Sequence, residues 1–208
     1  MVTRVAGSLR ALFACLVILV SAGSGPAVAV RLTYQIDPER STAGFAINHL
    51  GFIRERGQFN RASGTIVVDP AGIAGGSIEV VIDLTSVDTG WDLRDDFLRG
   101  ATMFDVARYP IMHFRSRHLE YRDRRVVAAE GDITLHGVTR PLRLEVQGLV
   151  CGRNPVDGRE GCGAVVTGHM LRRDFGIGFA YPLVGDDVDL DFAIAAFRIR
   201  DEGETTAP

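Results

Sequence analysis

The sequence contains no lysine, only one tryptophan and only three cysteines in 208 residues. All 23 basic residues are therefore arginines, and 26 acidic residues outnumber them. No stretch combines a basic run with interleaved aromatic side chains, which is the usual footprint of a nucleic-acid-binding surface. We therefore expect no nucleic acid among the partners of this chain.

Long apolar runs are also missing. The run at residues 11–20 spans ten residues, whereas a membrane-spanning helix needs about 20. Two arginines precede this run, and small residues follow it up to Ala29. This order is typical of a secretory signal peptide, and the run is too short for the alternative, a membrane anchor. We predict a signal peptide over residues 1–29 and a mature domain over residues 30–208 that is periplasmic or secreted.

Two of the three cysteines, Cys151 and Cys162, remain in the mature chain. An even number of cysteines in an exported chain favours a disulfide. The ten residues between them are rich in turn formers. A redox or metal-binding pair is the alternative, but the spacing is not that of a CxxC motif. We therefore predict a structural disulfide across the tip of a hairpin, and no metal site.

Catalytic motifs are absent as well. There is no Gly-x-Ser-x-Gly elbow and no glycine-rich phosphate loop. None of the five histidines has the helical spacing of a zinc site. Arg94, Asp95 and Asp96 could form an acid–base cluster, but a structural arginine–carboxylate pair is the simpler interpretation. The sequence favours a binding protein without catalytic residues and without a cofactor.

The mature chain is dominated by alternation of apolar and polar residues. About eight short segments alternate in this way between turn residues, which is typical of antiparallel strands. None has the continuous apolar run of a strand that is buried on both faces. One apolar face per strand predicts a closed barrel or a sandwich. Because these faces are rich in Gly, Ala and Phe, the interior either encloses a small ligand or is packed, with glycines at barrel bends.

One segment, residues 88–110, departs from this alternation. Its large apolar residues recur at the helical spacing of three and four, and Asp88 and Thr89 lie where an N-cap belongs. A lone helix in a β chain needs an apolar seat, and the open end of a barrel provides one. We expect this segment to be a lid or plug. Its expected apolar contacts are Trp91, Phe97 and Phe104.

His49 shares its parity with Phe45 and Ile47, so it is expected to point into the barrel. There it would either bind the polar head of an apolar ligand or form a hydrogen bond with the backbone as a core histidine, which is the simpler interpretation.

A series of short motifs runs through the chain from about Tyr34 to Phe197. The motifs include His49-Leu50-Gly51-Phe52, Asp69-Pro70, Asp88-Thr89-Gly90, Arg94-Asp95, Phe104-Asp105, Tyr109-Pro110, Phe114-Arg115-Ser116, Leu135-His136-Gly137-Val138-Thr139-Arg140-Pro141 and Asp174-Phe175-Gly176. In this order they resemble the YceI family. The resemblance implies an all-β fold with a short helical insert, an eight-stranded antiparallel lipocalin-like β-barrel. It also implies an apolar interior that holds a long isoprenoid chain, polyprenyl or quinone-type, in an exported protein.

Two positions depart from the family pattern. Phe97 stands where the family usually has His, and Arg173 stands where it usually has Ser. If the missing His serves a head group in relatives, that contact is lost here and the barrel mouth becomes more apolar. The loop between the two cysteines looks like a variant found in part of the family.

The leading expectation is a periplasmic carrier or storage protein for an isoprenoid lipid. Alternatives are a barrel for another amphiphile such as a fatty acid or amide, a lipid-modifying enzyme, and a structural module with a filled core. The expected partners are the lipid and, transiently, a membrane or a membrane-bound redox or lipid enzyme; a monomer and a homodimer both fit. The candidate ligand contacts are Phe45, Ile47, His49, Phe59, Trp91, Arg94, Phe97, Leu98, Phe104, Phe114, Val166, Met170 and Phe192.

Overall fold

The computed structural model describes residues 31–72 and 75–199, so the predicted signal peptide lies outside the described residues. The described strands are β1 (Leu32–Ile36), β2 (Thr42–His49), β3 (Ile53–Phe59), β4 (Ala62–Val68), β5 (Gly76–Asp83), β6 (Val87–Asp88), β7 (Ile111–Arg122), β8 (Arg125–Leu135), β9 (Val138–Arg153), β10 (Glu160–Leu171) and β11 (Val184–Ile199). The described helical elements are the 3₁₀ turns η1 (Leu84–Ser86) and η2 (Arg172–Phe175) and the helix α1 (Asp92–Arg99).

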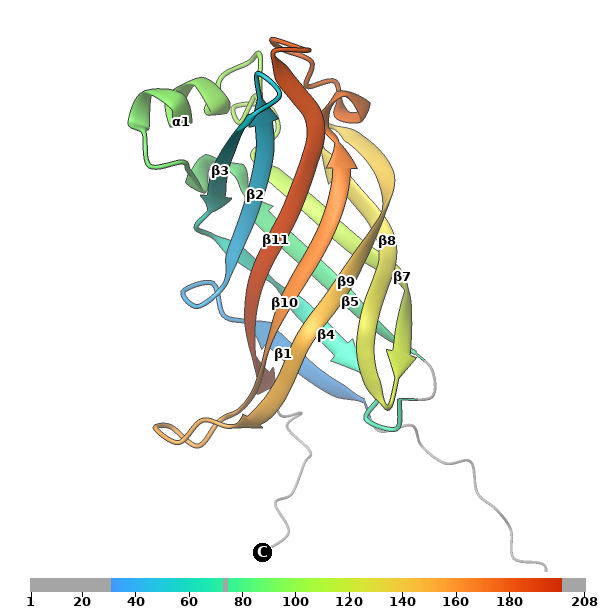
Figure 1. Cartoon of the computed structure of the whole chain (residues 1–208). Coiled ribbons are helices and arrows are strands. Elements are labelled where there is room, and N and C mark those ends of the chain that lie inside the picture. Colours follow the sequence, from blue (N-terminus) through green and yellow to red (C-terminus); the bar gives the residue numbers. More distant parts are fainter. Residues whose placement is uncertain (1–30, 73–74, 200–208) are drawn as a thin grey trace, which may run out of the picture.

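Eight of these strands close into an antiparallel barrel. The hydrogen-bonded order is β1-β4-β5-β7-β8-β9-β10-β11, and β11 pairs back with β1 (Figure 1). At one end β2, β3 and β6 extend the sheet from the long strand β11. The predicted eight-stranded antiparallel barrel is therefore confirmed. Residues 57–68 alternate throughout, yet they belong to two strands, because the chain bends between β3 and β4.

The two ends of the barrel carry different loops (Figure 1). The first, called the helix end here, carries the β2–β3 turn, the α1 segment (residues 89–110) and the loop that follows η2 (residues 176–183). The opposite end, called the hairpin end, carries the β4–β5 and β7–β8 turns and the β9–β10 hairpin. The predicted insert and the predicted disulfide hairpin thus lie at opposite ends of the barrel.

Register shifts interrupt the predicted alternation of inward-facing residues at several places, including one in β9 and one in β8. In β9, the register with β10 shifts beside Gly148, which has a positive φ of 59°. Leu149 therefore follows Val146 into the interior, where strict alternation along the strand would place Gly148. In β8, a register shift with β7 buries Val126, where strict alternation from Ala129 would place Val127. Each extra residue rotates the following side chains to the other face, which alternation cannot reveal.

The helix α1 begins later than predicted. Its N-cap position is Trp91, not Asp88 or Thr89. The Asp88 carboxylate instead accepts the N–H of Gly90, and the N–H of Thr89 donates to the Asp95 carboxylate across 2.9 Å. Helix α1 is eight residues long and gives way to turns at Gly100. Across residues 31–72 and 75–199, no helix has both the length and the apolar character needed to span a membrane.

Candidate ligand-binding cavity

A cavity of about 350 Å³ occupies the part of the barrel nearer the hairpin end. Its volume lies in the range of small-molecule sites, about 300–1,000 Å³. Most of its wall consists of inward aliphatic and aromatic side chains from all eight barrel strands and from β2. They are Leu32, Ile36, Ala43, Ala62, Ile66, Val68, Ile78, Val80, Ile82, Met112, Phe114, Val126, Ala129, Ile133, Leu142, Leu144, Val146, Leu149, Ala164, Val166, Phe192, Ile194 and Ala196.

The space comes from alanines and not from the barrel's glycines. A Cβ on Gly64 would lie 2.1 Å from the carbonyl oxygen of Glu79, and one on Gly131 would lie 2.2 Å from that of Arg115. These glycines therefore allow neighbouring strands to approach each other at bends. The small side chains that leave the cavity open are Ala43, Ala62, Ala129, Ala164 and Ala196. The alanines thus leave room for a ligand, and the glycines lie at barrel bends. The two interpretations of the small-residue faces apply at different positions.

The part of the barrel nearer the helix end is filled by side chains. The Phe59 ring contacts the rings of Phe45 and Phe104, each with a centroid distance of 5.5 Å. Leu98 and Met103 from the α1 segment pack against the same core. The segment therefore plugs the barrel at the end away from the cavity rim. No residue of the α1 segment lines the cavity.

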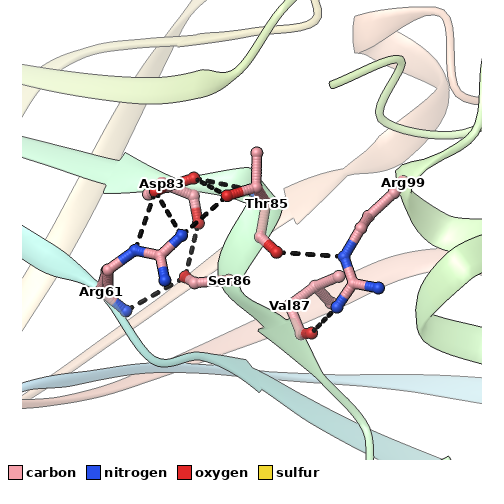
Figure 2. Close-up of polar contacts among 6 residues, drawn as sticks. All are labelled: Arg61, Asp83, Thr85, Ser86, Val87 and Arg99. Carbon is pink, nitrogen blue, oxygen red and sulfur yellow. Dashed lines mark hydrogen bonds and ion pairs between the residues drawn. The ribbon is translucent and has the colours of Figure 1, made fainter. Parts of the chain in front are cut away.

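Two arginine networks hold the plug in place (Figure 2). At the end of α1, Arg99 donates to the carbonyl oxygens of Thr85 and Val87 at 3.0 and 2.9 Å. Across the same bend, Arg61 donates to the Asp83 carboxylate at 2.9 and 2.7 Å. The Arg99 bonds fix the end of α1 to η1 and β6, and the Arg61 bonds hold the Asp83 side chain at the start of η1.

Arg94 and Asp95 serve the same plug. The Arg94 guanidinium donates to Glu55 at 2.5 Å and to the hydroxyl and carbonyl oxygens of Thr89 at 2.8 Å. Asp95 is only 5% exposed, and its carboxylate accepts the backbone N–H of Thr89. The geometry matches the structural arginine–carboxylate interpretation: Arg94 forms an ion pair with Glu55, and both Arg94 and Asp95 bond to Thr89.

The predicted contact residues fall into three groups. Phe114, Val166 and Phe192 line the cavity. Six pack into the core and do not line the cavity: Phe45, Ile47, Phe59, Leu98, Phe104 and Met170. Four lie outside the cavity at the helix end: His49, Trp91, Arg94 and Phe97.

The side chains of Trp91 and Phe97 are exposed, at 57% and 43%. The Phe97 ring stacks edge-on against Phe179 at 5.1 Å. Neither side chain lines the cavity.

The polar lining residues, which the sequence did not single out, gather at the hairpin end. They are Tyr34, Asp69, Tyr121, Arg124 and Arg125. Burial raises the pKa of the Tyr34 hydroxyl, Arg198 lowers it, and Glu160 raises it, with a net rise. The Tyr121 hydroxyl donates to the carbonyl oxygen of Gly75 at 2.7 Å.

The predicted disulfide is confirmed between Cys151 and Cys162, which are paired residues of β9 and β10 with Cα atoms 4.1 Å apart. Both cysteines line the hairpin-end part of the cavity. The bridge therefore braces the cavity wall as well as the hairpin. Within the described ranges, no group of three or more His, Cys, Asp or Glu side chains is arranged to hold a metal ion.

Two comparisons of the sequence point to one family. The model of the YceI-like domain matches residues 34–196. Protein YceI of Escherichia coli is 34% identical over 179 residues, which cover 85% of this chain and 91% of that protein.

Solved structures share the fold. The YceI protein of Campylobacter jejuni superposes with a TM-score of 0.62 at 28% identity, covering 74% of this chain and 90% of that one. A polyisoprenoid binding domain from Saccharophagus degradans superposes with a TM-score of 0.58 at 20% identity, covering 81% and 99%.

Proposed function

Because the chain belongs to the YceI-like family, we propose that it is a carrier or storage protein for an isoprenoid lipid of the polyprenyl or quinone type. The observation that carries this proposal is the apolar cavity of about 350 Å³, whose polar lining residues gather at one end. An apolar chain enclosed there gains about 25 cal/mol per Å² of surface removed from water. Support for the ligand class comes from the Saccharophagus degradans domain, a polyisoprenoid binding domain with this fold.

We propose that the protein binds the lipid without chemical change. The residues that were candidates for acid–base chemistry, Arg94 and Asp95, lie at the helix end and bond to Thr89 and Glu55. They are engaged in holding the plug, at the end of the barrel away from the polar lining of the cavity. A ligand site built from apolar walls and a few polar groups at one end is suited to holding and orienting a molecule.

We further propose export to the periplasm or the exterior, supported by the signal-peptide pattern of residues 1–29 and by the disulfide, since disulfides persist in oxidising compartments. The lipid would be exchanged through transient contact with a membrane or a membrane-bound redox or lipid enzyme. A monomer is sufficient for the site, because the cavity wall comes from one chain; a homodimer is compatible with it.

Extraction of the protein purified from its own host tests the proposal. The mature chain is extracted with organic solvent, and the extract is analysed by mass spectrometry against a mock purification. The expected result is one isoprenoid species near one molecule per chain. A fatty acid or amide mass in the same amount would favour the alternative amphiphile. No lipid above the mock level, together with no uptake of added isoprenoids by the delipidated chain, would contradict the proposal.

A further inference from the structure

The rim of the cavity at the hairpin end carries two arginines without carboxylate partners. Twelve arginines of the described chain form ion pairs with Asp or Glu side chains. Arg124 instead makes one long bond, 3.3 Å, to the carbonyl oxygen of Pro70. The Arg125 side chain forms neither an ion pair nor a hydrogen bond within residues 31–72 and 75–199. Both arginines line the cavity.

The backbone beneath these arginines is held by the neighbouring turn. Asp123 and Arg124 form the two-residue tip of the β7–β8 hairpin, with φ of 50° and 64°. A Cβ on Gly72 would lie 2.4 Å from the Cα of Arg124, so only glycine allows the β4–β5 turn to pack so closely against this tip. The hydroxyl of Tyr121 bonds across to the same turn through the Gly75 carbonyl. The arginines therefore project from a braced rim.

The other charges at this rim do not cancel the two arginines. Asp69 lines the cavity, and its carboxylate accepts the backbone N–H of Ala71 at 2.8 Å. Asp123 is at the hairpin tip, outside the lining. A third arginine, Arg31, is close by, since its Nη2 atom lies 3.8 Å from the position of a Cβ on Gly75. The arginines thus outnumber the carboxylates around the opening.

We propose that this rim is a subsite for an anionic head group, a carboxylate or a phosphate, carried by the lipid whose apolar chain fills the barrel. The subsite rests on the proposed function, because it requires the chain to occupy the cavity. Guanidinium groups donate paired N–H bonds that match the geometry of carboxylate and phosphate oxygens. A neutral alcohol or amide of the same chain length carries no negative charge for the guanidinium groups to attract. The subsite therefore binds a charged lipid more tightly than a neutral lipid with the same chain.

Binding of matched lipid pairs to the delipidated mature chain tests the subsite. The pairs are farnesyl phosphate with farnesol, and palmitate with palmitamide, measured by native mass spectrometry or calorimetry at low salt. Wild-type protein is expected to bind the charged member of at least one pair roughly tenfold more tightly, which is about 1.4 kcal/mol. A preference confined to one pair identifies phosphate or carboxylate as the head group. The double substitution Arg124→Gln/Arg125→Gln is expected to abolish the preference, so that the charged member binds no more tightly than the neutral one.

Arg140→Gln is the matched control. Arg140 is an exposed β9 arginine beside the β8–β9 turn, and its guanidinium donates to the carbonyl oxygen of the neighbouring Thr139. This variant is expected to keep the preference. Equal wild-type affinity for both members of both pairs, or a preference that survives in the double variant, would overturn the subsite while leaving the carrier proposal standing. Failure of all four lipids to bind would overturn both proposals.

Discussion

Substitution of one cavity alanine should separate lipid binding from stability. Ala164 lies on β10 and lines the cavity opposite Ile194 of β11. Ala164→Leu adds three carbon atoms in space that the ligand chain would occupy. At about 0.8 kcal/mol for each buried methylene, exclusion of a matching length of lipid costs about 2 kcal/mol. The dissociation constant should therefore rise roughly 30-fold.

The free protein should respond differently. Because the new side chain enters an existing cavity, the overpacking cost of about 1–3 kcal/mol that is typical of a filled core should not arise. Lipid affinity is measured by titration of the delipidated chain, and the free energy of unfolding by urea denaturation. Ala193→Leu is the control, since Ala193 faces outward at an exposed position of the neighbouring strand β11. Unchanged affinity in Ala164→Leu, or an equal loss in Ala193→Leu, would refute the assignment of the cavity as the lipid site.

Three further predictions concern the frame around the cavity. Arg99→Ala removes two hydrogen bonds to backbone carbonyls and should lower the free energy of unfolding by about 2–3 kcal/mol in urea; a loss below about 0.5 kcal/mol would show that the plug does not depend on this residue. Cys151→Ser/Cys162→Ser opens a loop with a sequence separation of 11 and should cost about 2–3 kcal/mol, whereas wild-type stability that is unaffected by reductant would contradict the bracing role. For Asp186, burial would raise the carboxyl pKa, but hydrogen bonds from the Arg173 N–H and guanidinium hold it below its ordinary value. The stabilisation is therefore complete above the ordinary carboxyl pKa of about 4 and is lost as the pH falls through the lower folded value. Asp186→Asn should accordingly be less stable than wild type at pH 7, with a gap that closes in acid; a gap that is independent of pH in urea titrations would contradict this reasoning.

Antiparallel strands with one apolar face each were predictable from the alternation, which left a closed barrel and a sandwich open. The resemblance to the YceI family is what pointed to closure. Parity correctly placed Phe114, Val166 and Phe192 on the inner face, where they line the cavity. It went wrong at Gly148 and Val127, since a bulge changes the facing of side chains without changing composition. The disulfide was predictable because two cysteines flanked a turn-rich loop.

The location of the cavity along the barrel was not predictable. Phe59 and Phe104 looked like ligand contacts, yet they contact each other and fill the helix end. That outcome depends on how residues far apart in the sequence meet. Arg124 and Arg125 gave no signal, because a polar hairpin tip resembles many others until closure of the barrel places it at the rim of a cavity. How far along the barrel a residue lies, and whether it reaches the rim of the cavity, depend on the tertiary structure. The face of the strand to which a side chain points depends on the local sequence.

Photo-crosslinking tests the central claim most directly. A geranylgeranyl lipid with a diazirine on its chain is bound to the delipidated mature protein, irradiated, and mapped by peptide mass spectrometry. If the part of the barrel nearer the hairpin end holds the chain, the labelled residues should be inward ones such as Val166 and Ile194. Labelling confined to the exposed helix-end residues Trp91 and Phe97 would contradict the account.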